Sequence, residues 1–202
     1  YAGHYLESDV LKRTARACRG AILAKRMRNS RVGLVGSPFA GMGDFCVPFD
    51  ELRRDIGLEI VSYDEQRGMQ AVQGVTQQQI DDEWKLDRAL FEVEPCVTRA
   101  LYDRTARVSL ALRHWREEER LSALTVNFLA TEDSNPALPV MPFTECSKSM
   151  MNGIGYAGEG DVLTAALVGA LLGVFPETSF SEMFCPDWKG NSIFLSHMGE
   201  FN

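Results

Sequence analysis

The stretch from Tyr156 to Leu167 (YAGEGDVLTAAL) combines a glycine-flanked acid with the start of an apolar helix. Asp161 is suited to cap that helix, because an aspartate side chain at this position accepts a hydrogen bond from a free backbone N–H group. Glu159 then lies just outside the helix N-terminus, where the helix dipole favours an anion. The stretch therefore predicts a helix entry with a carboxylate that points outward.

Before this stretch, segments with helical spacing alternate with short apolar segments. Leu11, Ala15, Cys18 and Ile22 recur on one helix face behind Ser8, a candidate N-cap. Strands are expected at residues 31–36, 58–63 and 121–128, and helices at 49–56 and, on both sides of Pro95, within 77–121. This alternation predicts an α/β fold of the doubly wound, Rossmann-like kind: an open, mostly parallel sheet with helices on both faces.

We expect two parts in the chain. Residues 1–175 are predicted to form the α/β domain, and residues 176–202 the first strands of a following β domain. Residues 130–143 contain three prolines, which is typical of a loop that lines an active site. The sequence does not begin with Met, and its last residues, 194–202, have strand character, so both ends are interpreted as cut from a longer protein.

The amino-acid composition limits the kinds of molecule that the chain is expected to bind. The net charge is −7 and 21 basic residues are interpreted as scattered, which argues against a surface for nucleic acid or anionic membranes and favours a small neutral molecule. Five cysteines without a CxxC pair predict reduced thiols and a cytoplasmic protein. The most apolar segment, residues 162–175, is shorter than the roughly 20 residues of a membrane span, so a buried helix is expected there.

Two acids and a histidine form the candidate site: Glu159, Glu182 and His197. They lie 23 and 15 residues apart, so each must come from a different element. Taken singly, each has an ordinary explanation, a solvated acid or a histidine satisfied in the core. Together they suit a divalent cation, and a cation beside a spare carboxylate suits proton transfer next to a carbonyl.

Three blocks in the same order resemble the L-arabinose isomerases, within the wider group that also contains L-fucose isomerase. The blocks are Gly155 to Leu167, Thr178-Ser179-Phe180 followed by Glu182, and Gly190-Asn191 leading to Ser196-His197-Met198 and Glu200. A weaker likeness extends through residues 4–65, and residues 70–130 match only in pattern. The chain thus resembles the middle domain of such an enzyme together with the start of its C-terminal domain.

The resemblance implies a metal-dependent aldose–ketose isomerase that moves a proton between C1 and C2 of a sugar through an enediol. Glu159, Glu182 and His197 would bind a divalent metal, usually manganese, with a second histidine that lies beyond this chain, so little activity is expected from these 202 residues alone. The two glutamates would divide the acid and base roles. The resemblance also implies a homo-oligomer, a trimer or hexamer. We expect an aldose or ketose as the small-molecule partner, with no nucleic-acid or membrane partner and no organic cofactor.

Several alternatives stay open. Met183 and Phe184 follow the second acid where the family commonly has Asp and an aromatic residue, which leaves the sugar open. Trp188 is expected near the site, where it would stack on a sugar face. A metal-directed hydride shift would give the same product as an enediol. A sugar-binding module without catalysis, or an assembly domain, is compatible with the same α/β layer.

Overall fold

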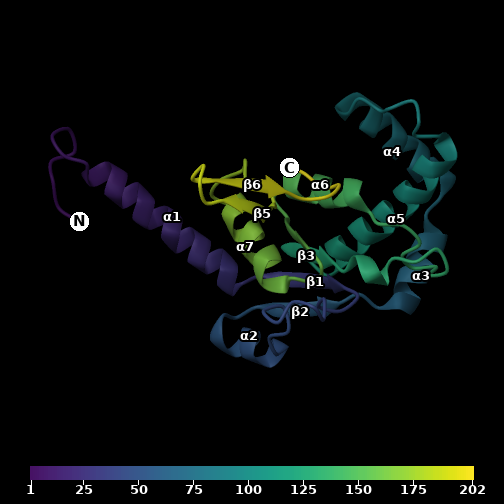
Figure 1. The fold of residues 1–202 in the computed structure, drawn as a ribbon, viewed down its shortest axis with the longest axis horizontal. Helices are drawn as coiled ribbons and strands as arrows, with labels where there is room; N and C mark the ends of the chain where they lie inside the picture. The colour runs from purple at the N-terminus through teal and green to yellow at the C-terminus, as the bar shows by residue number, and fades with distance from the viewer.

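A four-stranded parallel sheet organises the chain, and the computed structural model describes all of residues 1–202 (Figure 1). Its strand order is β2-β1-β3-β4. In the middle of the sheet, Val32 pairs with Ile60 on one side and with Ala123 on the other. The strands are β1 (Arg31–Val35), β2 (Glu59–Ser62), β3 (Ala123–Val126) and β4 (Gly155–Gly158). The predicted parallel α/β layer is confirmed.

Seven α-helices and one 3-10 turn connect and cover these strands. They are α1 (Val10–Arg28), α2 (Phe49–Asp55), α3 (Glu65–Gly74), α4 (Gln77–Leu90), α5 (Arg99–Glu118), η1 (Phe128–Ala130), α6 (Phe143–Met151) and α7 (Val162–Leu172). Two glycines allow helices to pack closely on opposite faces. A Cβ at Gly33 would meet Trp115 of α5 at 2.6 Å, and one at Gly155 would meet the Ala165 carbonyl of α7 at 2.2 Å.

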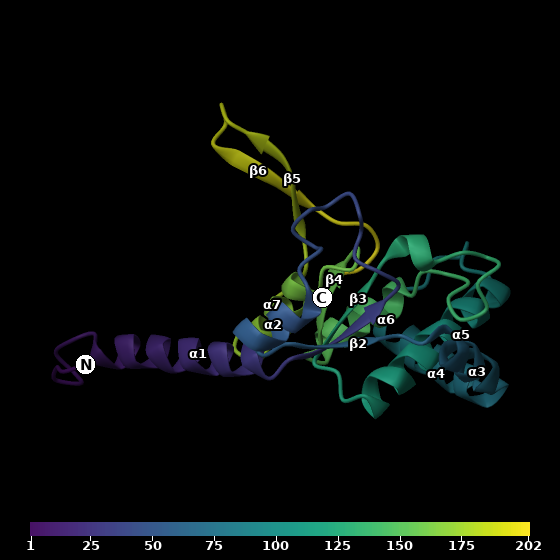
Figure 2. The same cartoon turned by 90° about the horizontal axis from the view of Figure 1, so that it is seen from below.

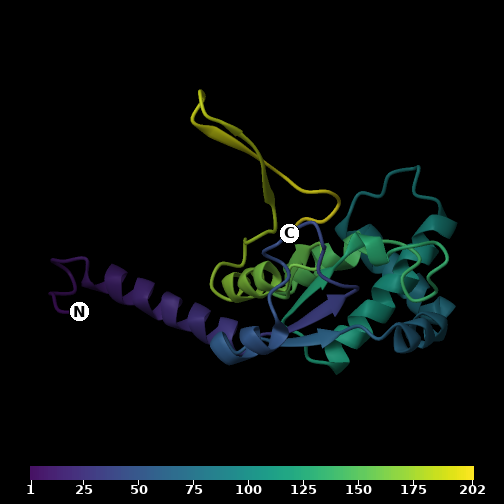
Figure 3. The same ribbon diagram turned by 60° about the horizontal axis from the view of Figure 1, so that its bottom comes forward.

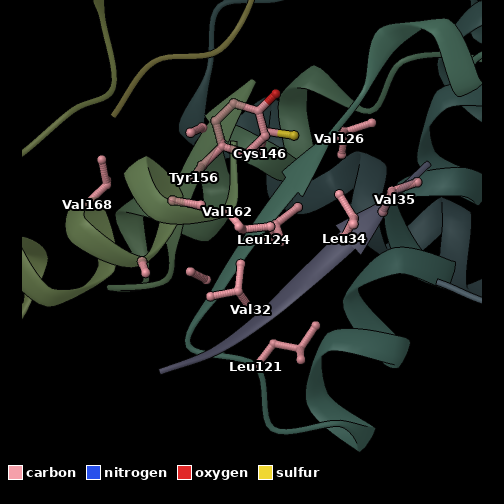
Figure 4. Close-up of a cluster of buried hydrophobic side chains, with 14 of the residues drawn as sticks. Val32, Leu34, Val35, Leu121, Leu124, Val126, Cys146, Tyr156, Val162 and Val168 are labelled. Carbon is pink, nitrogen blue, oxygen red and sulfur yellow. The ribbon is translucent and has the colours of Figure 1, made fainter. Parts of the chain in front are cut away.

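The main core lies between the sheet and α7 and continues to α6. Val32, Leu124 and Val162 are at most 2% exposed and pack in one cluster of buried side chains (Figure 4). Burying a valine or leucine side chain stabilises the fold by about 1.5–3 kcal/mol. Helix α7, which begins at Val162, is the buried helix that the sequence predicts.

Two helices were not predicted, and one strand ends earlier than expected. Helix α3 contains two glycines, and α6 is short and polar, so neither has a strong helical pattern. The strand-like run predicted for residues 194–202 ends at Ser196, because Gly199 turns the chain back with a φ of 92°. That turn buries Glu200, which is 1% exposed, against the α/β domain.

Helix α1 departs from two expectations. It begins after Asp9, whose side chain forms no cap, although Ser8 Oγ accepts a hydrogen bond from the Val10 N–H at 3.4 Å. It also holds seven of the 21 Lys and Arg residues within 19 positions, so the basic residues are clustered and not scattered. None of its residues is buried, and it projects away from the sheet (Figure 1).

The last elements form a separate antiparallel hairpin, β5 (Glu182–Asp187) and β6 (Ser192–Ser196). It stands away from the parallel sheet (Figures 2 and 3). The division into domains at residue 175 stays a prediction. No helix combines the length and the apolar character needed to cross a membrane.

Candidate active site

Glu159 lies at the carboxyl end of β4, in the turn that leads into α7. Its φ is 62°, a left-handed conformation that is costly for a residue with a side chain. The turn is fixed by hydrogen bonds: the Glu159 N–H donates to the Val126 carbonyl at 3.0 Å, and the Phe39 N–H donates to the Glu159 carbonyl at 2.9 Å. Asp161 caps α7 by accepting from the Thr164 N–H at 2.9 Å, as predicted.

Glu182 and His197 meet at the base of the hairpin. Glu182 is the first residue of β5 and pairs in register with Ser196, so His197 follows directly beside it. The distance from His197 Nε2 to Glu182 Oε1 is 3.9 Å. Antiparallel pairing thus brings together two residues that lie far apart in the sequence.

His197 also contacts the end of β4. A Cβ at Gly158 would lie 3.2 Å from His197 Nε2, so the glycine leaves room for the imidazole next to Glu159. The ring packs edge-on against Phe180, with 4.6 Å between the centroids. The side chain is 15% exposed, so the histidine is neither free in solvent nor enclosed in the core.

Glu200 holds the other side of the imidazole. Its carboxylate Oε1 lies 2.9 Å from His197 Nδ1, and its side chain is completely buried. The contact is an ion pair only when the imidazole is protonated, and a neutral imidazole that carries its proton on Nδ1 leaves Nε2 free. Glu200 raises the pKa of His197 above its usual value. We did not assign a role to Glu200 from the sequence, although it lies three residues after the histidine in the same block.

Two neutral groups lie next to the buried carboxylate of Glu200. The hydroxyl of Tyr156 and the thiol of Cys146 lie side by side beneath the end of β4 (Figure 4). Burial raises the pKa of the Cys146 thiol, and burial together with Cys146 and Glu200 raises the pKa of Tyr156. Both groups are therefore neutral at physiological pH, and they offer no positive charge to Glu200.

The site carries an excess of negative charge. Burial and the charge of Glu182 raise the pKa of Glu159, and His197 opposes them only in part. Three carboxylates, from Glu159, Glu182 and Glu200, thus surround a single imidazole. Carboxylates that share a site repel one another, and a cation between them relieves that repulsion.

The donor chemistry fits a divalent cation, although the ligands are not gathered around one point. No three His, Cys, Asp or Glu side chains lie close enough together to coordinate a metal. Two carboxylates and an imidazole nevertheless suit a hard to borderline ion such as manganese. Glu200 occupies Nδ1 of His197 and leaves Nε2 free as a ligand, an arrangement common in metal sites.

Two hollows open near this edge of the sheet. The smaller, about 110 Å³, is lined by Glu159, His197 and Glu200 together with apolar side chains such as Phe128 and Met141. The larger, about 380 Å³, lies beside the ends of β1 and β3 and is lined by neutral groups except for Glu65. Of the three predicted site residues, Glu159 and His197 line the smaller hollow and Glu182 does not. Trp188, expected near it, is 87% exposed in the turn at the far end of the hairpin, so that expectation is wrong.

Comparison with known proteins agrees with the resemblance in the sequence. The L-arabinose isomerase central domain family matches residues 51–174. L-arabinose isomerase from Geobacillus kaustophilus is 27% identical over 98% of this chain, and the enzyme from Flavobacterium johnsoniae is 24% identical over 98%. The enzyme from Salmonella typhi is 36% identical over 47% of the chain. The chain spans 41% of the length of the first two relatives. The chain belongs to the L-arabinose isomerase family.

Proposed function

We propose that the full-length protein is a metal-dependent aldose–ketose isomerase of the L-arabinose isomerase type. The main support is the position of His197, which lies 3.9 Å from Glu182, contacts Gly158 next to Glu159, and has Glu200 on the other side of its ring. Relatives over 98% of the chain are named L-arabinose isomerase, which supports a small sugar as the substrate.

Glu159, Glu182 and His197 would hold the cation, with manganese the expected ion. When bound, a divalent cation polarises a sugar carbonyl and stabilises the negative charge that develops as a neighbouring C–H bond breaks. The chain itself contributes the geometry. The turn at Glu159 and the base of the hairpin present the acids from two directions, and the apolar lining of the hollow limits the access of water.

Glu159 and Glu182 divide the proton transfer in this proposal. A carboxylate with a raised pKa is a better base, because its conjugate acid is closer to the operating pH. Glu159 has such a raised pKa, as a result of burial and of Glu182. A proton removed from C2 of the aldose would be returned at C1, which is the enediol route. Solvent deuterium in the product would distinguish this route from a hydride shift.

The test is an isomerase assay of the full-length protein with a panel of L- and D-aldoses, in manganese and in chelator. We expect ketose formation that depends on the metal, and a loss of about 10²–10⁴-fold in kcat for Glu159→Gln or Glu182→Gln. Glu177→Gln, at an exposed acid of the loop before β5, is the matched control and should keep its rate. Sugar binding without metal or turnover would instead support a binding module and contradict the proposal.

A further inference from the structure

The side-chain hydroxyl of Tyr156 is buried and has no aligned hydrogen-bond partner. Tyr156 lies in the middle of β4, and the whole residue is 0% exposed. Buried polar groups in folded proteins nearly always have a hydrogen-bond partner, because a group without one loses its bonds to water and gains nothing in return. The hydroxyl therefore needs an acceptor among its immediate neighbours.

Two side chains are available as that acceptor. Besides burial, Cys146 and Glu200 raise the pKa of Tyr156, so both lie beside its hydroxyl. Figure 4 shows the thiol of Cys146 next to the Tyr156 hydroxyl. A thiol sulfur is a weak acceptor, whereas a hydrogen bond to a carboxylate is about twice as strong as one between neutral groups. Glu200 is therefore the better acceptor for the hydroxyl.

Glu200 has one carboxylate oxygen to spare. Its Oε1 lies 2.9 Å from His197 Nδ1, and its Oε2 is buried without a hydrogen-bond partner. An ionised carboxylate only accepts hydrogen bonds, so its two oxygens match two donors, the His197 Nδ1–H and the Tyr156 hydroxyl. Tyr156 and Glu200 also line the same hollow. A donor without a partner and an acceptor without a partner are thus neighbours.

Backbone contacts fix the turn that carries Glu200. Gly199 precedes it with a φ of 92°, and a Cβ there would lie 2.7 Å from the Phe143 ring. The Phe201 N–H donates a hydrogen bond to Ser147 Oγ at 2.8 Å. These contacts determine where Glu200 enters the site, and the donors around its carboxylate determine how the carboxylate is oriented.

Aromatic packing holds the plane of the imidazole. Phe180 lies edge-on to both neighbouring rings, with its centroid 6.0 Å from that of Tyr156 and 4.6 Å from that of His197. Gly158 lies against the other ring nitrogen, since a Cβ there would be 3.2 Å from His197 Nε2. Packing does not decide which nitrogen carries the proton. The partner of Nδ1 does.

We propose that Tyr156 is a positioning residue for the metal site: its hydroxyl donates to Glu200, which thereby stays oriented to accept from the Nδ1–H of His197. These two hydrogen bonds fix the tautomer that leaves Nε2, 3.9 Å from Glu182 Oε1, able to bind a cation. Tyr156 does not touch the cation and acts through Glu200. The inference rests on the metal-dependent function proposed above and adds a residue to it.

The test is a Mn²⁺ titration of the full-length Tyr156→Phe variant, which loses one oxygen atom and keeps the ring. The Kd for Mn²⁺ should rise about tenfold, the lower end of the effect of losing a partner of a metal ligand. In a Glu200→Gln background the same substitution should add no further loss, because residues of one network are not additive. An unchanged Kd, or an equal loss with and without Glu200, would overturn the proposal.

Tyr63→Phe is the matched control. The Tyr63 hydroxyl is also buried without an aligned partner, and its ring packs edge-on against Trp115 of α5, with 4.9 Å between the centroids. Its removal should leave the Kd for Mn²⁺ unchanged. Equal effects of Tyr63→Phe and Tyr156→Phe would show that the loss of any buried hydroxyl weakens the site, which contradicts a specific role of Tyr156.

A readout without metal separates this inference from the proposed function. Raman bands of tyrosine report whether its hydroxyl donates, and the difference between the wild type and Tyr156→Phe isolates Tyr156. We expect a strong donor in the wild type and a weak one in a Glu200→Leu background, and identical signals would overturn the proposal. Absence of Mn²⁺ binding by the wild type would overturn the proposed function and with it the metal-positioning role, while the Raman result would still decide whether Tyr156 holds Glu200.

Discussion

Two clusters of charged side chains lie on opposite sides of α6, and they differ in balance. The first, here called the α4–α6 network, contains equal numbers of acids and cations: Glu83, Asp87 and Glu145 with Arg113, Arg116 and Lys148. The second is the candidate active site, in which three carboxylates face one imidazole. The network is neutral within itself, whereas the site is not.

The difference separates a structural role from a functional one. In the network, Arg113 Nη2 lies 2.6 Å from Glu83 Oε1 and 2.6 Å from Glu145 Oε2, so the buried charges neutralise each other. A buried charge without a partner is costly, and proteins keep such charges mainly where a ligand completes them. In the site only Glu200 is fully buried, and His197 is the one cationic partner that the three acids share, so the proposed cation would complete them.

Helix α6 connects the two clusters through adjacent residues. Glu145 faces the network, and Cys146 lies beside Tyr156 on the side of the site. The same helix also contacts the last turn of the chain, where Ser147 Oγ accepts a hydrogen bond from the Phe201 N–H at 2.8 Å. The network thus fixes the helix against which Glu200 is packed.

Breaking the network should produce the largest loss of stability. In Lys148→Met, Glu83 and Asp87 lose a buried cation, and the free energy of unfolding should fall by about 3–5 kcal/mol. Lys85→Met on α4 removes an exposed pair with Asp82 and should have little effect, because solvent screens exposed pairs. Chemical denaturation of both variants measures the loss in the free energy of unfolding. Equal effects would remove the distinction between a buried network and surface pairs.

The network should also make the free energy of unfolding depend on pH. Burial acts to raise the pKa of Glu83, but hydrogen bonds from Arg113 and Lys148 outweigh it and lower the pKa to about 2. A lowered carboxyl pKa contributes stability above the unfolded pKa that is lost as the pH falls toward the folded one. The contribution of Glu83 is about 3 kcal/mol and should disappear between about pH 5 and pH 2.

Glu83→Gln is the variant that tests the contribution of Glu83 to the free energy of unfolding. Denaturation curves recorded between pH 7 and pH 2 should converge for the wild type and the variant at the acid end. A constant difference between the two proteins over the whole range would mean that Glu83 is not held ionised by its partners.

A smaller effect is expected at the site from Glu200→Gln. The variant keeps the size of the side chain but removes the charge that faces His197 Nδ1 at 2.9 Å. Loss of such a partner typically lowers metal affinity by about 10–100-fold. Manganese titration of the full-length variant measures this, with Glu177→Gln as the control. Unchanged affinity would show that Glu200 does not orient the imidazole.

The parallel layer could be predicted from the sequence because its strands are short apolar runs and α7 is apolar on all sides. The cap at Asp161 was also predictable, since it depends only on local chemistry. The partnership of Glu200 with His197 was not, because it depends on the turn at Gly199. The exposure of α1 was equally hidden, as an amphipathic pattern indicates an apolar face but not whether anything covers it.

Manganese binding tests the central claim most directly. The full-length protein is titrated with Mn²⁺, and free ion is followed by electron paramagnetic resonance. The account predicts saturable binding of one ion per chain, abolished by Glu182→Gln and retained in Lys85→Met. Absence of saturable binding in the wild type, or identical binding in Glu182→Gln, would contradict a metal site at the base of the hairpin.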